Sequence, residues 1–297
     1  MTNTLLRSQK KIPDHIVEIL RDVFGASAKL GIKAFVIGAT ARDLIFEYAY
    51  GADIRRKTED VDFAISVRSW AEYQNLKSEL IGGGRFRNDK NQELRLWWKG
   101  GSDRMRVDLV PYGGLESGEA NIQFPPHGDF AMSTLGFRET SDNLLVLQLT
   151  EEFAAEVASL PGLVLLKFVA YHDRPAERRR DVQDIWFIAQ NYMKAGNEDR
   201  LYGENSGDHD LLTEGDFDYR TVGARLLGRD LAPLLTDDTR KIVTRILAHE
   251  TDGGVIPTFA DVIHADGLRD SNRYDDILLT LAEFWRGVRE GLSKKEN

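Results

Sequence analysis

The sequence contains no cysteine among its 297 residues. Disulfide bonds, thiolate zinc sites and cysteine nucleophiles are therefore excluded, as is typical of proteins in a reducing compartment. No apolar run approaches the roughly 20 residues that cross a bilayer. The polar, basic segment from Met1 to Ile12 also lacks the apolar core of a signal peptide. These features predict a cytoplasmic protein that has no membrane-spanning segment.

Positive charge is scarce as well. Lysine and arginine total 39 against 48 aspartate and glutamate residues, which gives a formal net charge of −9. A protein that coats nucleic acid non-specifically usually has the opposite balance. Eight carboxylates and one arginine fall between Asn197 and Tyr219, which predicts a solvated loop there. The balance argues against non-specific coating of nucleic acid and leaves a local basic groove open.

Apolar residues make up 42% of the chain, which is enough for a packed core. Short apolar runs at 34–37 and 61–67 predict buried strands, and alternating segments at 93–98 and 105–110 predict a hairpin. Helical periodicity marks 12–31, 41–50, 69–80, 163–171, 181–192, 221–235, 238–249 and 274–292.

This order of elements predicts an α+β fold. Residues 1–150 are expected to form a mixed sheet flanked by helices, and residues 151–297 a mainly helical second domain. The first domain does not show the repeated strand–helix–strand rhythm of a dinucleotide-binding fold.

Three aspartates in the first half are candidate metal ligands. Asp60 and Asp62 open a predicted strand, and residues two apart on a strand point to the same face. Asp108 interrupts the apolar strand Val107 to Val110. If these strands are neighbours, three carboxylates converge, and hard oxygen ligands of this kind suit Mg²⁺ or Mn²⁺ together with substrate phosphates.

The turn Gly38-Ala39-Thr40 joins a strand to a helix and is a candidate phosphate site. Glycine allows close approach of the backbone, the helix start offers free N–H groups, and Thr40 adds a hydroxyl. Each feature alone has a simpler reading: a plain turn, a solvent-facing Asp-x-Asp pair, or Asp108 paired with Arg104 or Arg106. The ordered set is more specific than any one part.

The sequence resembles the DNA polymerase β-type nucleotidyltransferases, and among them the AbiEii/AbiGii toxin family, to which the MenT toxins are related. The resemblance rests on residues 36–44 (VIGATARDL) and 58–65 (TEDVDFAI), followed by 166–170 (LKFVA), Arg174 and 180–185 (RDVQDI). It covers roughly residues 30 to 190. The family usually has Gly or Ser where Ala39 stands, and some of its members lack the third carboxylate.

The resemblance implies a catalytic set and a nucleotide-binding set. The catalytic set is Asp60, Asp62, Asp108, Lys167 and Asp184, of which the first three would hold the metal. The nucleotide-binding set is Gly38, Ala39, Thr40, Arg42 and Lys167. Taken from the residues alone, Lys167 on an apolar helix either reaches out to water or meets an anion. The arginines at 174, 178 and 179 are equally compatible with an acceptor contact and with plain exposure.

The resemblance implies metal-dependent transfer of a nucleoside monophosphate from an NTP to an acceptor hydroxyl, with tRNA 3′ ends as one acceptor class and an antitoxin as a partner. Two alternatives stay open. One is transfer to a small molecule, as in aminoglycoside nucleotidyltransferases, and the other is a nucleotide-binding module without activity. We expect no P-loop and no zinc site, because neither pattern is present.

Overall fold

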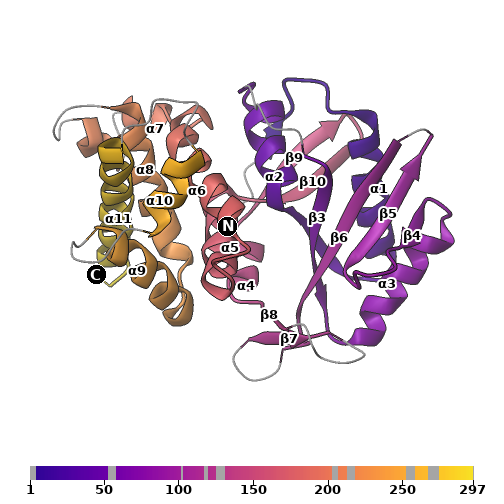
Figure 1. Cartoon of the computed structure of the whole chain (residues 1–297). Helices are drawn as coiled ribbons and strands as arrows, with labels where there is room; N and C mark the ends of the chain where they lie inside the picture. Colours follow the sequence, from indigo (N-terminus) through magenta and orange to yellow (C-terminus); the bar gives the residue numbers. More distant parts are fainter. Residues whose placement is uncertain are drawn as a thin grey trace. The chain divides into compact units, whose positions relative to one another are not determined.

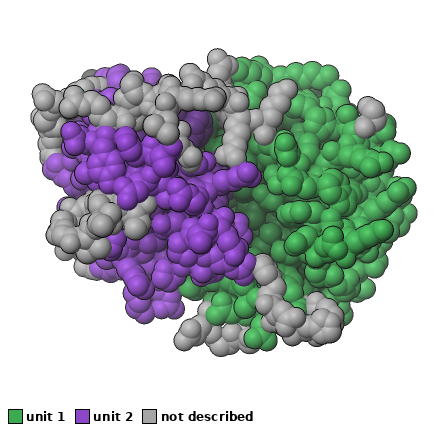
Figure 2. Space-filling model, in the orientation of Figure 1, with its two compact units in different colours: residues 1–159 green, residues 160–297 purple. Residues whose placement is uncertain are grey.

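A computed structural model describes residues 5–52, 58–101, 103–116, 120–124, 131–202, 207–212, 218–251, 258–266 and 274–296. The chain divides into two compact units, Met1–Ser159 and Leu160–Asn297, which are coloured separately in Figure 2. No helix in the described ranges combines the length and apolar character needed to cross a membrane.

The first unit is built on an eight-stranded mixed sheet. In sheet order its strands are β1 (Leu5–Arg7), β9 (Leu144–Thr150), β10 (Phe153–Ala158), β2 (Lys33–Ile37), β3 (Asp60–Val67), β6 (Asp103–Gly113), β5 (Arg95–Gly100) and β4 (Phe86–Asn88). The pairs β1–β9, β10–β2 and β3–β6 are parallel and the other pairs are antiparallel. A two-stranded sheet of β7 (Asn121–Gln123) and β8 (Ala131–Ser133) is separate.

Two helices cover one face of the large sheet (Figure 1). Helices α1 (Asp14–Lys29) and α3 (Trp70–Gly82) pack against each other and against the sheet. Phe24 of α1 meets Phe63 of β3 edge-on, with ring centroids 5.9 Å apart, and Val61 is fully buried. Because side chains alternate along a strand, Asp60 and Asp62, which flank Val61, face the opposite side of the sheet.

The segment after β2 is helical from its first residue. It consists of α2 (Gly38–Asp43), which continues as the π-helical turn η1 (Leu44–Ala49). A further short helix of this unit is α4 (Phe137–Ser141). The helix predicted at 41–50 therefore begins three residues earlier.

The strand β10 corrects the expectation that the chain is helical from residue 151 onward. Its sequence, FAAEVA, has three alanines and only one β-branched residue, so local propensity does not mark it as a strand. Pairing with β9 on one side and β2 on the other makes it one. The helical unit consequently starts at Leu160.

The second unit is all helical in its described residues. Its helices are α5 (Leu160–Asp173), α6 (Arg179–Asn191), α7 (Asp199–Tyr202), α8 (Tyr219–Leu231), α9 (Asp237–Thr251), α10 (Thr258–Asp266) and α11 (Tyr274–Glu296), with short 3-10 turns at Tyr192–Lys194, His209–Leu212 and Ala232–Leu234. Phe168 of α5 stacks on Phe259 and lies against Phe284 in the core of this unit.

The acidic stretch predicted as a solvated loop is partly anchored to α8. Arg200 binds Asp230 through two hydrogen bonds, of 2.6 and 2.9 Å, and also binds Asp208. Arg229 of α8 binds Asp208 and Asp210. Several of the carboxylates counted in this stretch therefore act as ion-pair partners within the unit.

Candidate active site

Asp60 and Asp62 lie on the sheet face that α1 and α3 leave uncovered. Both keep partial exposure, while Val61 between them is buried. The predicted same-face placement of the two carboxylates is confirmed by this alternation. The side chain of Asp60 is 33% exposed, and Nη2 of Arg106 lies 3.5 Å from its Oδ2. This cation partly offsets the repulsion between the two carboxylates.

Gly38 lies directly against the carboxylate of Asp62. Its φ of +69° falls in the left-handed region, and a Cβ at this position would overlap Oδ2 of Asp62 and lie 3.0 Å from its Cγ. In the sheet, Ile37 pairs with Asp62, so the chain leaves β2 beside this carboxylate. Glycine is therefore required here both for the backbone angle and for space.

The turn is tied to β3 by the side chain of Thr40. The Thr40 hydroxyl donates a hydrogen bond of 2.7 Å to the backbone carbonyl of Asp60. Its one hydroxyl hydrogen is thus used within the protein. Gly38 and Ala39 retain partial exposure, and direct contact with a phosphate at this turn would fall to their backbone N–H groups.

Arg42 is buried and bound to its neighbour. Its guanidinium donates hydrogen bonds of 2.8 and 2.7 Å to Oδ1 of Asp43, and the Thr58 hydroxyl donates to Oδ2 of the same carboxylate. The Arg42 side chain is only 5% exposed, and this cluster joins the C-terminal end of α2 to Thr58, two residues before β3. The nucleotide contact predicted for Arg42 stays a prediction.

Asp108 lies beside Asp62, as the prediction required, since these residues are register partners on the parallel strands β3 and β6. Its carboxylate is engaged by Arg95 of β5, which donates hydrogen bonds of 2.8 and 2.7 Å to its two oxygens. Such a bidentate pair is among the strong side-chain interactions. The hydrogen bond to Asp108 raises the pKa of Arg95 above its ordinary value.

No group of three or more His, Cys, Asp or Glu side chains in the described part of the chain is arranged as a metal site. Asp60 and Asp62 offer two hard oxygen donors, and Mg²⁺ is commonly held by one or two carboxylates together with substrate phosphates. The donor set therefore fits a divalent cation at Asp60 and Asp62. Ligation by Asp108 would require its pair with Arg95 to open or share.

Lys167 of α5 is buried and binds two carboxylates of α6. Its ammonium lies 3.0 Å from Oδ1 of Asp181 and 2.7 Å from Oδ2 of Asp184. Lys167 is 7% exposed, so the alternative in which it reaches out to water is wrong. Burial alone would lower the pKa of Lys167, but the two carboxylates outweigh it and raise that pKa, which keeps the ammonium charged.

The predicted residues thus form two clusters. Asp60, Asp62 and Asp108 belong to the first unit with the Gly38 turn, and Lys167 and Asp184 belong to the second. Near the start of α6, Arg178, Arg179 and Arg180 are exposed, and Arg174 before them is half-buried.

Arg95 was missed by the sequence reasoning, although the sequence carries a signal for it. Gly100 pairs with Asp103 at the hairpin turn. Counting five residues back along one strand and five forward along the other places Arg95 opposite Asp108. Alternation within this hairpin also predicts one buried and one surface tryptophan, and Trp98 is 1% exposed while Trp97 is 40% exposed.

Comparison with known proteins identifies one family. The family model described as "Nucleotidyl transferase AbiEii toxin, Type IV TA system" matches residues 18–265. No curated protein matches the chain.

The solved structures that resemble the chain include the following three. An antigenic nucleotidyltransferase-like protein from Paracoccidioides brasiliensis has a TM-score of 0.41 at 14% identity and covers 70% of this chain and 93% of its own. JHP933 from Helicobacter pylori has a TM-score of 0.37 at 13% identity, and the match covers 96% of this chain and 97% of JHP933. The Thermotoga maritima CCA-adding enzyme, complexed with tRNA, has a TM-score of 0.31 at 12% identity, and the match covers 96% of this chain and 82% of that enzyme.

Proposed function

The chain belongs to the AbiEii nucleotidyltransferase toxin family, and we propose that it transfers a nucleoside monophosphate from an NTP to an acceptor hydroxyl at the 3′ end of tRNA. The acceptor oxygen forms a bond to the α-phosphorus, the bond to the pyrophosphate breaks, and the hydroxyl proton passes to solvent. The observation that carries the proposal is the close approach of the Gly38 backbone to the carboxylate of Asp62, which sets a strand-to-helix turn directly beside a candidate metal ligand.

The roles at this site follow from the contacts. The backbone N–H groups of Gly38 and Ala39 bind a phosphate of the NTP, since these two residues keep partial exposure. Thr40 holds Asp60 in place through the hydrogen bond to its carbonyl. Asp60 and Asp62 hold Mg²⁺ or Mn²⁺, which when bound would supply neutralisation of the phosphate charge and activation of the attacking hydroxyl.

Lys167 and Asp184 are assigned to the same reaction. The paired carboxylates keep Lys167 charged, and a fixed ammonium is suited to a triphosphate. Asp184 and Asp181 orient this ammonium through hydrogen bonds of 2.7 and 3.0 Å.

An incorporation assay tests the proposal. Wild-type protein is incubated with each of four labelled NTPs, Mg²⁺ and total tRNA, and label in the RNA is measured. Asp62→Asn keeps the shape and removes the charge, so it should lower the rate about 100-fold or more, since metal stabilisation of the transition state is worth several kcal/mol. Asp14→Asn is the matched control, because Asp14 is exposed at the start of α1, and it should leave the rate unchanged.

The two alternatives give different results in the same assay. Label in an aminoglycoside or another small acceptor, without label in RNA, would move the assignment to a small-molecule transferase. If calorimetry shows that the protein binds Mg²⁺·ATP and that Asp60→Ala weakens this binding, but no acceptor receives label, the chain is a nucleotide-binding module. Absence of both binding and transfer would contradict the proposal.

The family description names a toxin of a toxin–antitoxin system, and we extend the proposal to growth inhibition relieved by a partner antitoxin. Induced expression of the wild-type chain should stop growth, and the Asp62→Asn chain should not. Equal inhibition by both proteins would contradict a catalytic toxin.

A further inference from the structure

A cationic pocket lies within the second unit, in the part of the chain where the sequence offers no recognisable motif. Its volume is about 860 Å³. The described residues that line it are Gly207, His209, Asp210, Arg225, Arg229, Arg286, Arg289, Glu290, Ser293 and Lys294. None of them has a hydrophobic side chain, and five cations lie there with two carboxylates. Two further carboxylates bind these arginines from outside the lining, Asp208 on Arg229 and Glu283 on Arg225, so the cations still exceed the carboxylates by one.

The pocket is built by close packing of α8 on α11. A Cβ at Gly287 would overlap the backbone of Arg225, and one at Gly228 would overlap the backbone of Phe284. These glycines let the two helices approach closely, which brings the guanidinium groups of α8 against Glu290 of α11. The residues are therefore held by helix packing on rigid elements.

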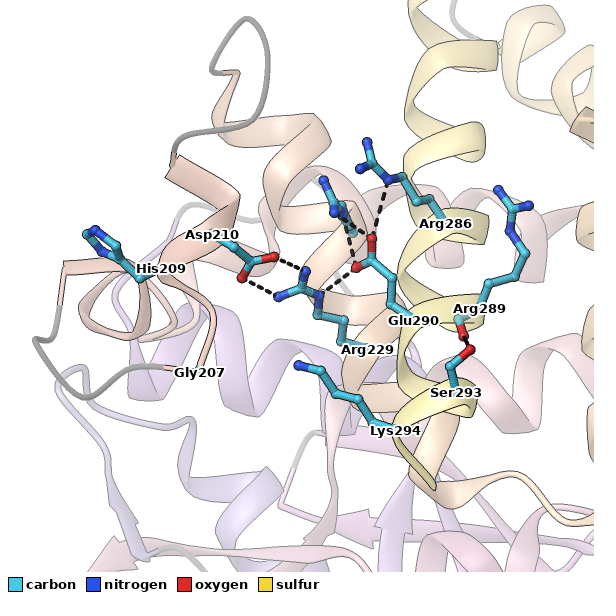
Figure 3. Close-up of a pocket in the computed structure, with 10 residues that line it drawn as sticks. Gly207, His209, Asp210, Arg229, Arg286, Arg289, Glu290, Ser293 and Lys294 are labelled. Atoms are coloured by element: carbon cyan, nitrogen blue, oxygen red, sulfur yellow. Dashed lines mark hydrogen bonds and ion pairs between the residues drawn. The ribbon is translucent and has the colours of Figure 1, made fainter. Parts of the chain in front are cut away.

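The floor of the pocket is a fixed ion network (Figure 3). Arg225 and Arg229 have side chains that are 5% and 7% exposed, and both bind Glu290. Arg229 also binds Asp210. Its hydrogen bonds lower the pKa of Asp210, and although burial would raise the pKa of Glu290, the bonds from both arginines lower it.

Further cations lie at the rim of the pocket. Arg289 and Lys294 of α11 are exposed, and Arg289 lies over the ring of Trp285 at 5.5 Å from its centroid. Arg286, which is 43% exposed, reaches Glu290 at 3.3 Å. Figure 3 shows Arg286 and Lys294 on either side of Arg229 and Glu290. Because several rim residues are exposed, the pocket is open to solvent.

We propose that this pocket binds the phosphate backbone of the polynucleotide acceptor. The inference rests on the proposed function for the identity of the acceptor, and on the pocket for the place of contact. Guanidinium groups match the oxygens of a phosphate bidentately. Lys294 lies eight positions after Arg286, which is a rise of about 12 Å along the helix axis, so the rim spans more than one phosphate.

The composition of the pocket favours a nucleic acid over a protein or a membrane. Protein interfaces have an apolar or aromatic centre, and peripheral membrane sites insert apolar side chains. Neither feature is found among the described residues that line this pocket. A surface with charge and no apolar centre is the footprint of phosphate contacts, whose strength depends on salt.

The test measures the affinity of the full-length protein for tRNA as a function of salt. The double variant Arg289→Gln/Lys294→Gln removes two exposed cations and should reduce the slope of log K against log salt by about 1.4 to 1.8, with roughly 15- to 30-fold weaker binding at 0.15 M salt. The control Lys241→Gln/Arg245→Gln removes two exposed cations of α9 outside the pocket. The control should leave both quantities unchanged.

The outcomes separate this inference from the proposed function. An unchanged slope in the pocket variant, an equal change in the control, or equal competition by polyglutamate and by a single-stranded RNA would each overturn the inference. If the pocket variant transfers label to RNA as fast as the wild type, the inference is also overturned, while the proposed function stands. Pocket-dependent RNA binding by a wild-type protein that transfers no label would support the inference and contradict the proposed function.

Discussion

Replacement of Gly38 by alanine is a stringent test of how the site is built. At φ +69° an alanine pays about 1–2 kcal/mol for the left-handed conformation. Its Cβ would also overlap Oδ2 of Asp62, and overpacking of this kind costs about 1–3 kcal/mol. The Gly38→Ala variant is therefore expected to lose about 2–5 kcal/mol of unfolding free energy and to displace the Asp62 carboxylate.

Gly31 supplies a matched control within the same unit. Its φ is +67°, and nothing lies within 4 Å of a Cβ built on it. Gly31→Ala should therefore cost only the conformational part, about 1–2 kcal/mol. The difference between the two variants isolates the collision with Asp62.

Urea unfolding followed by tryptophan fluorescence and by circular dichroism measures both variants. Adding Asp62→Ala to Gly38→Ala removes the overlap with Oδ2 and Cγ and leaves a 3.2 Å approach to Cβ of residue 62, so the cost of Gly38→Ala in that background should fall toward that of Gly31→Ala. A double-mutant coupling below about 0.5 kcal/mol would refute the contact. Equal costs for Gly31→Ala and Gly38→Ala in the wild-type background would refute it as well.

Three further predictions concern the paired charges. Lys167→Met leaves the buried carboxylate of Asp184 and the half-buried carboxylate of Asp181 without their shared cation, and it should cost about 3–5 kcal/mol in urea unfolding. A loss below about 1 kcal/mol, the range of a surface ion pair, would contradict the ion cluster. In the wild type, the pKa of Lys167 is raised above its ordinary 10.5, so the stability from this charge is complete below pH 10.5 and is lost only as pH rises through the higher folded pKa. Arg95→Gln frees Asp108, so Mn²⁺ affinity measured by calorimetry should rise if Asp108 is a metal ligand, and unchanged affinity would remove Asp108 from the ligand set.

The core of the first unit was accessible from the sequence because its signals are local. The apolar run ending at Ile37, the break at Gly38 and the alternation from Asp60 each report a property of a short segment. The strand β10 was not accessible, because FAAEVA has little strand propensity and its place in the sheet depends on pairing with β2, which is distant in the sequence, as well as with the adjacent β9.

The sequence by itself determined the same-face placement of Asp60 and Asp62 and the position of Gly38 at the end of a strand, since both follow from local periodicity. Only the tertiary structure decided what these residues meet: Asp62 against Gly38, Arg95 on Asp108, and two carboxylates around Lys167. The cationic pocket was decided entirely by the tertiary structure, because its cations lie on α8 and α11, about sixty residues apart in the chain. Charge composition is a sum along the chain, whereas recognition depends on which charges packing brings together.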